Sequence, residues 1–205
     1  MTIEQIKVGY DKFSYVIFDH VSKKAAVVDP AFDVKNILSF ISSNNLGLEY
    51  IILTHYHYDH TSSTSKILNV YPNAKIVISK SDGEKLDLNI QISIVNNCRL
   101  KLGRLTLNII LTPGHTPGGI CIIVNNKAIL TGDTLFIDDC GRADLPGGSI
   151  SDLFESLQKI KKLPDILIVY PGHDYGSKTF DKLGEQKKTN KTLLAETLDD
   201  FSKIQ

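Results

Sequence analysis

The strongest constraint on the fold is a cluster of histidine and aspartate that follows a short apolar segment. The segment Tyr50–Leu53 is typical of a buried strand. The residues that follow it are Thr54, His55, Tyr56, His57, Tyr58, Asp59 and His60. A tight turn after a strand can direct several of these side chains to one point, and imidazole nitrogen and carboxylate oxygen suit zinc, iron or manganese. The chain is therefore expected to fold so that a metal site lies at the end of a buried strand.

Three residues further along the chain repeat this arrangement. His115, Asp133 and His173 each stand beside glycine or proline, just after an apolar segment. Those segments are Leu105–Leu111, Ala128–Leu130 and Ile166–Val169. Loops at one end of a sheet are where α/β proteins commonly build their sites. Five of the six histidines belong to this set, so ordinary surface or core roles explain them poorly; His20 is the exception and is expected in a polar turn.

Strand and helix patterns elsewhere favour a layered mixed α/β domain. Strands are expected at Phe13–Phe18, Ala25–Val28, Lys75–Ser79, Ile90–Val95 and Cys121–Val124. Helices are expected at Val34–Ile41, at Ser65–Val70, along the stripe Leu153, Leu157 and Ile160 with Ser151 as N-cap, and at Leu193–Ile204. Strands outnumber helices and occur in runs as well as in alternation with them, which favours helices covering the faces of sheets. We expect one domain over 1–205, with 174–205 as a short C-terminal appendage.

Composition excludes several classes of partner. The chain has 205 residues, with 23 Lys+Arg and 23 Asp+Glu, so it lacks the basic excess that nucleic acid or an anionic membrane surface requires. Its apolar runs are too short to span a bilayer, and Met1–Tyr10 is unlike a signal peptide. Three scattered cysteines do not form a disulfide framework. We expect a cytoplasmic protein that binds a small molecule; the oligomeric state is not readable from the sequence.

The complete motif set resembles the metallo-β-lactamase superfamily, whose signature is T-H-x-H-x-D-H followed by a histidine, an aspartate and a last histidine. The resemblance implies an αββα sandwich of two mixed sheets flanked by helices, with the metal site at the sheet edge. It implies a first metal held by His55, His57 and His115. It implies a second metal held by Asp59, His60 and His173, with Asp133 bridging the two.

Two segments resemble the branch that contains glyoxalase II (hydroxyacylglutathione hydrolase) and the persulfide dioxygenases. They are Thr131–Phe136 with the following Cys140–Leu145, and Tyr170–Gly176. The pattern C-G-R-x-D at Cys140–Asp144 resembles the corresponding segment of persulfide dioxygenases. Glyoxalase II more often has C-G-K at this place and a longer C-terminal domain. Only about 30 residues follow Tyr175, which favours the dioxygenase. Short hydrolases of the branch also carry G-R-x-D, so the hydrolase stays open.

The two activities imply different metal content. A dioxygenase would use one Fe(II) per chain, which the resemblance assigns to His55, His115 and Asp133 on one face, and would oxidise a glutathione-type persulfide to sulfite. The remaining ligand residues would then support the first three. A thioester hydrolase would use a Zn²⁺ pair or a mixed Zn/Fe pair to activate water. Asp59 and Asp133 are the expected catalytic residues. A metal-binding scaffold without activity is the least favoured hypothesis.

Arg142 and Tyr175 are the expected substrate-binding residues. Arg142 follows the metal-site aspartate, where its guanidinium can bind a carboxylate of the thiol, and Tyr175 follows the last histidine. The alternative for Arg142 is a salt bridge within its loop, and the alternative for Tyr175 is packing. Cys140 is expected to anchor the loop, with a redox-sensitive thiol as the alternative.

Overall fold

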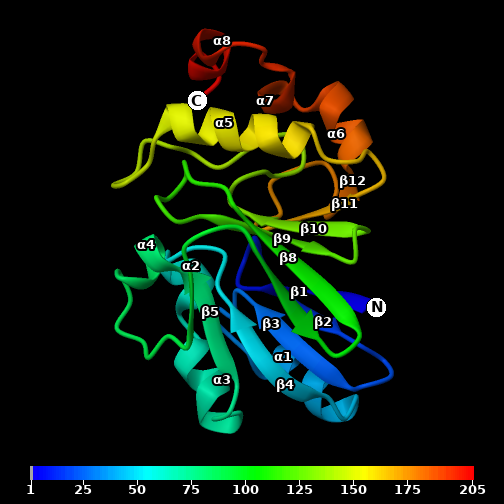
Figure 1. The fold of residues 1–205 in the computed structure, drawn as a ribbon. Coiled ribbons are helices and arrows are strands. Elements are labelled where there is room, and N and C mark those ends of the chain that lie inside the picture. The colour runs from blue at the N-terminus through cyan, green and yellow to red at the C-terminus, as the bar shows by residue number, and fades with distance from the viewer. Residues whose placement is uncertain (1) are drawn as a thin grey trace.

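Within residues 2–205, which the computed structural model describes, two mixed β-sheets pack face to face and helices cover the outer face of each (Figure 1). The strand order is β1-β2-β3-β4-β5-β6 in the first sheet and β12-β11-β10-β9-β8-β7 in the second. The predicted αββα fold class is therefore confirmed. Met1, part of the predicted domain 1–205, lies outside the described residues.

The first half of the chain builds the first sheet and its helices. The strands are β1 (Thr2–Val8), β2 (Lys12–Phe18), β3 (Lys24–Val28), β4 (Gly47–Ile52), β5 (Lys75–Ser79) and β6 (Ile92–Ile94). The helices are α1 (Lys35–Ser43), α2 (Tyr58–Thr61), α3 (Thr64–Val70) and α4 (Lys80–Gly83). Strands β1 to β3 pair antiparallel, and β3 to β6 pair parallel.

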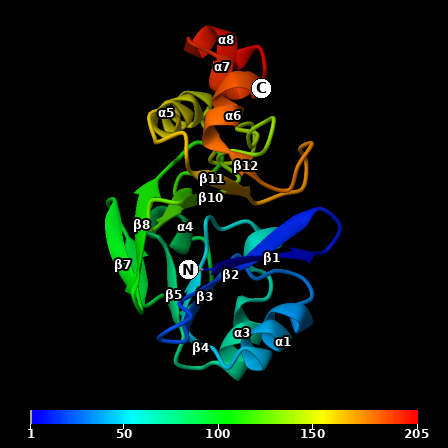
Figure 2. The ribbon, with the colours of Figure 1, turned by 90° about the vertical axis from the view of Figure 1, so that its right-hand side faces the viewer.

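The second half builds the second sheet. Its strands are β7 (Cys98–Leu102), β8 (Leu105–Leu111), β9 (Ile120–Val124), β10 (Ala128–Gly132), β11 (Ile168–Pro171) and β12 (Asp181–Lys182). Its helices are α5 (Ile150–Lys161), α6 (Leu183–Thr189), α7 (Lys191–Leu194) and α8 (Leu198–Ser202). These helices lie over the outer face of the second sheet (Figure 2).

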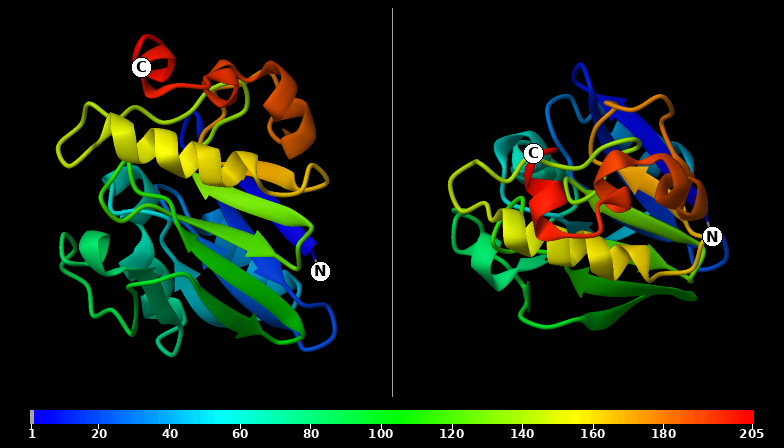
Figure 3. Two further views of the ribbon diagram at one scale, coloured as in Figure 1. Left: turned by 45° about the horizontal axis from the view of Figure 1, so that its top comes forward. Right: turned by 90° about the horizontal axis from the view of Figure 1, so that it is seen from above.

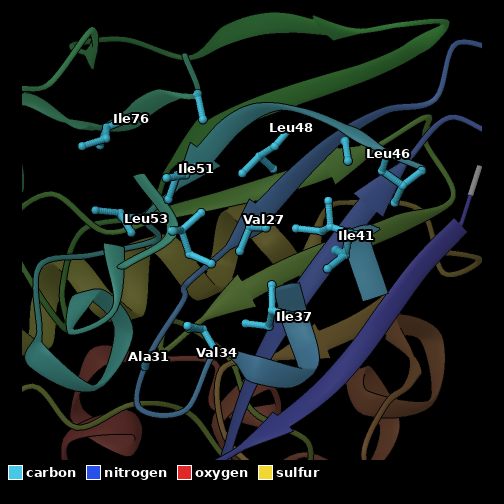
Figure 4. Close-up of a cluster of buried hydrophobic side chains, with 14 of the residues drawn as sticks. Val27, Ala31, Val34, Ile37, Ile41, Leu46, Leu48, Ile51, Leu53 and Ile76 are labelled. Carbon is cyan, nitrogen blue, oxygen red and sulfur yellow. The ribbon is translucent and has the colours of Figure 1, made fainter. Parts of the chain in front are cut away.

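Alternation of side chains along the strands explains the layers. In β2, Val16 and Phe18 face the helices of the first sheet, whereas Tyr15 and Ile17 face the second sheet. Figure 4 shows the helix side of this sheet, where Ile37 and Ile41 of α1 pack with strand residues such as Val27 and Ile51. Because the strands are apolar on both faces, each sheet is buried on both sides.

The third apolar layer joins α5 and the C-terminal helices to the second sheet. Leu153, Leu157 and Ile160 form one buried stripe of α5, as the sequence predicts. Leu193 and Phe201, from the predicted appendage 174–205, are buried in the same cluster. Figure 3 shows these last helices beside α5 over the sheet.

Two helix predictions are wrong, and side-chain capping explains both. Ser149, not Ser151, is the N-cap of α5, because its hydroxyl accepts the backbone N–H of Asp152. The predicted closing helix Leu193–Ile204 is divided into α7 and α8. The backbone is extended at Ala195, and the Thr197 hydroxyl caps a new helix by accepting the N–H of Asp200.

Three strands, β1, β7 and the two-residue β12, were absent from the sequence prediction. β1 is a half-exposed edge strand in which Glu4, Gln5 and Lys7 obscure the apolar pattern. β7 alternates Arg99 and Lys101 with inward residues, a pattern that identifies a half-buried strand. No helix within residues 2–205 is both long and apolar enough to cross a membrane.

Strand direction brings the candidate ligands to one edge. β3 and β4 are parallel, so both end at the same edge of the first sheet. β8 and β10 each pair antiparallel with β9 and therefore run the same way, and β11 is parallel to β10. Backbone hydrogen bonds join the two edges: Ile120 N donates to Thr54 O at 2.9 Å, and Phe13 N donates to Gly172 O at 2.9 Å.

We expect Ile51→Ala to lower the free energy of unfolding by about 2 to 5 kcal/mol, because Ile51 has no exposed surface in the central strand β4. Ile166→Ala is the matched control, since Ile166 is 71% exposed, and it should change stability by less than about 0.5 kcal/mol. Urea denaturation followed by circular dichroism measures both. Equal effects of the two substitutions would contradict the assignment of β4 to the core.

Candidate metal centre

The loops after β4, β8, β10 and β11 bring all seven predicted ligand residues together. Their nitrogen and oxygen atoms form three overlapping groups in which the atoms lie close to one another. The trihistidine group is His55, His57 and His115. The Asp59 group is Asp59, His60 and His173. The third group, His55, His60 and Asp133, shares one residue with each of the other two, so Asp133 lies between them.

The trihistidine group brings three imidazole nitrogens to one point. His57 Nδ1 lies 3.0 Å from His55 Nε2 and 3.0 Å from His115 Nε2. His57 comes from the start of α2, and His115 comes from the Pro–Gly turn after β8. His57 therefore contacts both other histidines directly. The dioxygenase hypothesis does not require this contact, because it treats His57 as a residue that supports the iron ligands and not as a ligand itself.

The Asp59 group lies on the other side of Asp133. Asp59 Oδ2 is 3.1 Å from His173 Nε2 and 3.5 Å from His60 Nε2. Asp133 Oδ1 is 3.1 Å from His60 Nε2, and Asp133 Oδ2 is 3.4 Å from His173 Nε2 and 3.6 Å from His115 Nε2. The two oxygens of Asp133 thus face both groups.

Asp29, directly after the predicted strand Ala25–Val28, is a site residue that the sequence analysis did not identify. Its carboxylate accepts the N–H of Thr54 at 2.7 Å, the Thr54 hydroxyl at 2.6 Å and the Nδ1–H of His60 at 2.8 Å. Like the ligands, it directly follows a buried strand and precedes proline, so the same signal identifies it. Its backbone has φ +51°, a left-handed conformation that aspartate tolerates better than most residues.

Hydrogen bonds on the far side of the rings set the tautomers of two ligands. With Nδ1 of His60 donating to Asp29 and Nδ1 of His115 donating to the carbonyl of Arg142 at 2.6 Å, Nε2 of both rings keeps its lone pair. Such outer partners orient metal-binding histidines and raise their basicity.

The donor set fits a metal ion. Within residues 2–205, His60 Nε2 and Asp133 Oδ1 are buried and make no hydrogen bond, although both face the centre. Lone pairs of neutral imidazoles that meet at 3.0 Å cannot satisfy one another without a shared proton or a cation. Nitrogen and carboxylate oxygen donors in this number suit Fe, Zn or Mn, so these seven residues could hold one or two such ions.

Electrostatics also favours cation binding. Burial lowers the pKa of His55 well below its ordinary value, so the ring is neutral. Burial acts to raise the pKa of Asp133, but His60 and His173 outweigh it and hold that pKa well below the ordinary range. Neutral imidazole and ionised carboxylate are the forms that bind metal.

Two glycines leave room for this convergence. Gly132 has φ +50°, and a Cβ there would come within 2.5 Å of Thr54 Oγ1. A Cβ on Gly172 would overlap Asp133 Oδ1 and crowd His60. The glycines before Asp133 and His173 are therefore required by close contact between the loops.

Two buried charged residues near the centre escaped the sequence reasoning. Lys12, fully buried at the start of β2, donates from Nζ to Gly172 O at 2.9 Å. Asp82 accepts the N–H of Tyr56 at 3.1 Å and the hydroxyl of Thr116 at 2.7 Å. It thereby connects the loops that carry His57 and His115. No local sequence pattern distinguishes either residue from a surface charge.

A cavity of about 440 Å³ opens beside the ligands. Apart from ligand residues, its lining includes Phe136, Cys140, Arg142, Leu145 and Tyr175. The volume suits a small-molecule ligand.

The two predicted substrate residues both line this cavity. Tyr175 stacks on the ring of His173 with centroids 4.6 Å apart. Burial, followed by the charges of Asp11 and Asp133, raises the pKa of Tyr175 to about 12, so its hydroxyl stays a donor. Arg142 is exposed and pairs with Asp144, as the salt-bridge alternative for this residue expected. An exposed pair of this kind contributes little stability, so a substrate carboxylate can compete for the guanidinium.

Cys140 has the environment of a structural residue. Burial, followed by the charge of Asp139, raises the pKa of its thiol to about 12, and Gln205 Nε2 donates to Sγ at 3.1 Å. A thiol with so high a pKa is a poor nucleophile. These contacts favour the anchor over the redox-sensitive thiol.

The C-terminal helices hold one wall of the cavity. Asn190 Nδ2 donates to the carbonyls of Phe136 at 3.2 Å and Asp139 at 3.0 Å, and the side-chain oxygen of Gln186 accepts the N–H of Asp138 at 2.8 Å. Lys187 donates to the carbonyl of Leu163, whereas Lys191 of α7 pairs with the cavity residue Asp139 at 3.0 Å. The helices therefore hold this wall through amide side chains and one ion pair.

Comparison with known proteins identifies relatives of two kinds. The profile of the metallo-β-lactamase superfamily matches residues 9–91 and 99–173. The mitochondrial persulfide dioxygenase ETHE1 of Homo sapiens is 32% identical over 195 residues, covering 94% of this chain and 75% of that protein. A hydroxyacylglutathione hydrolase of Pelagibacter ubique is 34% identical over 176 residues, covering 85% of this chain and 72% of that protein.

A solved crystal structure has the same fold over the whole length of this chain. The crystal structure of ETHE1 from Myxococcus xanthus superposes with a TM-score of 0.89 and 27% identity, covering 100% of this chain and 89% of that one. The sequence relatives and this structure support the superfamily branch that the motifs indicated.

We expect Asp29→Asn to weaken metal binding by about 10- to 100-fold, because the amide cannot replace the carboxylate that orients His60 and Thr54. Isothermal titration of the metal-free protein measures this change. Asp87→Asn, on the exposed loop before β6, is the control and should leave the affinity unchanged. Unaltered affinity in Asp29→Asn, with the fold intact, would contradict the role of Asp29.

Proposed function

The chain belongs to the metallo-β-lactamase superfamily, and we propose that it is an Fe(II)-dependent dioxygenase that oxidises the persulfide of a small glutathione-type thiol to sulfite. Its relatives, named as a dioxygenase and a hydrolase, indicate a metal-dependent enzyme. What we propose is that this chain catalyses the dioxygenase reaction and not the hydrolase reaction.

One observation carries the choice. The segment Cys140–Asp144, which has the C-G-R-x-D pattern, forms the wall of the cavity next to the ligands. Through the carbonyl of Arg142 it also accepts the Nδ1–H of His115 at 2.6 Å. The part of the sequence that most resembles persulfide dioxygenases therefore lines the cavity and contacts the candidate ligand His115.

The overall reaction is balanced without a further reductant. One persulfide, one O₂ and one water give one thiol and one sulfurous acid, which ionises to sulfite. The outer sulfur is oxidised, O₂ is reduced, and the sulfur–sulfur bond breaks with the electron pair going to the thiol. Fe(II), held by His55, His115 and Asp133, would supply O₂ activation and a binding position for sulfur.

The chain's own residues bind and orient the substrate. The guanidinium of Arg142 would pair with a carboxylate of the thiol, exchanging its exposed partner Asp144 for the substrate. Tyr175 would donate its hydroxyl to the same molecule, and its ring holds His173 in place. Phe136 packs edge-on against Tyr175 with centroids 5.2 Å apart and so helps to position that ring.

We expect anaerobically purified protein with about one Fe per chain to consume O₂ when glutathione persulfide is added, with one sulfite formed for each O₂. An oxygen electrode and sulfite determination measure this. Asp133→Ala should lose both activity and metal, because Asp133 faces both ligand groups. No O₂ uptake by the iron-loaded protein would refute the dioxygenase.

We expect Arg142→Met to raise KM for the persulfide by about tenfold with little change in kcat, because it removes a contact made equally in the ground and transition states. Arg99→Met is the matched control, since Arg99 lies on β7 outside this cavity. Steady-state O₂ uptake gives both constants. A lower kcat at unchanged KM would instead point to a role in the chemical step.

The second candidate is a binuclear thioester hydrolase. The observation that favours it is the division of the ligand atoms into a trihistidine group and an Asp59 group, with Asp133 between them. Two metals per chain and steady thiol release from S-lactoylglutathione without O₂ would support it. Failure to hydrolyse thioesters with either zinc or iron bound would exclude it.

A further inference from the structure

We propose that Asp82 is the positioning residue of the trihistidine group: its buried carboxylate holds together the two loops that carry His57 and His115, so that their imidazoles can bind the same ion. The inference rests on the metal centre of the proposed function, but not on the reaction or the substrate. It assigns a role in metal binding to a residue outside the seven ligands.

The fold places Asp82 in the interior beside the ligand loops. β5 is parallel to β4, so the two strands end at the same edge of the first sheet. Ser79, the last residue of β5, caps α4 by accepting the N–H of Asp82 at 3.3 Å. The neighbouring Lys80 and Ser81 are exposed, whereas the Asp82 side chain has no exposed surface. Its carboxylate therefore points inward from a fixed turn.

One oxygen of this carboxylate joins both loops of the trihistidine group. Asp82 Oδ2 accepts the N–H of Tyr56 at 3.1 Å and the hydroxyl of Thr116 at 2.7 Å. Tyr56 lies between two histidines of the group, and Thr116 directly follows the third. Asp29, by contrast, accepts a hydrogen bond from the ring of His60, in the Asp59 group. The two halves of the centre thus contact different buried carboxylates.

His57 depends on its backbone for its position. The rings of His60 and His115 each donate from Nδ1 to an outer partner. Within residues 2–205, the His57 ring lies at hydrogen-bonding distance only from the rings of His55 and His115. The bond from the Tyr56 N–H to Asp82 fixes the chain directly before His57. Loss of this bond should therefore displace the His57 ring.

The His115 loop is packed directly on the carboxylate. A Cβ on Gly118 would come within 2.6 Å of Asp82 Oδ1, so only glycine allows this approach. Thr116 has no exposed surface either. Without the carboxylate, the N–H of Tyr56 and the hydroxyl of Thr116 would be left unpaired in the interior, a cost that shifted loops would relieve.

The test compares Zn²⁺ affinity in two backgrounds that each keep one half of the centre. His173→Ala leaves the trihistidine group complete, and His57→Ala leaves the Asp59 group complete. We expect Asp82→Ala to weaken Zn²⁺ binding by about 10- to 100-fold in the His173→Ala background, and by less than about threefold in the His57→Ala background. Isothermal titration of the metal-free variants measures both changes.

Asp19→Ala is the control for loss of a buried carboxylate elsewhere. Asp19 accepts the N–H of Arg104 at 3.0 Å and follows β2, about 20 Å along the strand from Lys12, which pairs with the ligand His173. Asp19→Ala should lower stability and leave Zn²⁺ affinity unchanged in both backgrounds. For Asp82→Ala, equal losses in the two backgrounds, or no loss in either, would overturn the inference.

Thr116→Val decides if Asp82→Ala does not fold, because it removes one of the two bonds and keeps the shape of the side chain. It should weaken Zn²⁺ binding in the His173→Ala background alone, and unchanged affinity there would overturn the inference. A background-dependent loss in a chain that consumes no O₂ supports the role of Asp82 while refuting the dioxygenase. A wild type that binds no Zn²⁺ refutes the centre and, with it, this role.

Discussion

The carboxylate of Asp29 is the interaction on which the centre depends. It accepts hydrogen bonds from the backbone and side chain of Thr54 and from His60, so one buried group fixes both the start of the ligand loop and the tautomer of a ligand. Thr54 in turn accepts the N–H of Ile120 and so ties the first sheet to the second. A buried carboxylate that accepts three hydrogen bonds is stable in the interior, and it makes the surrounding geometry rigid.

The grouping of the ligands bears on both reactions named among the relatives. The ligand positions permit two metals, because the Asp133 carboxylate faces His115 as well as His60 and His173. Buried charges around these side chains change how strongly each position holds a cation, so the ligand motif is only one part of what determines metal number.

The ligand residues were predictable because their signal is local. A histidine or aspartate beside glycine or proline, directly after a buried strand, marks a loop at a sheet edge, and Asp29 carries this signal as fully as the others. The wrong assignments have equally local causes. Ser149 and Thr197 accept backbone N–H groups that other serines and threonines nearby could also have taken, and only the packed helices show which residue serves as the cap.

By itself the sequence determined the superfamily, the sandwich and the set of side chains able to hold metal, because strand periodicity and motif order depend on neighbours along the chain. Only the tertiary structure decided how these side chains are grouped, and that Lys12, Asp82 and Asn190 are buried against the site and not exposed on the surface. Their partners lie in strands and loops far away in sequence, such as Gly172, Thr116 and Phe136. A charge becomes influential when it is removed from water, and burial is a property of the packed sheets that no segment has alone.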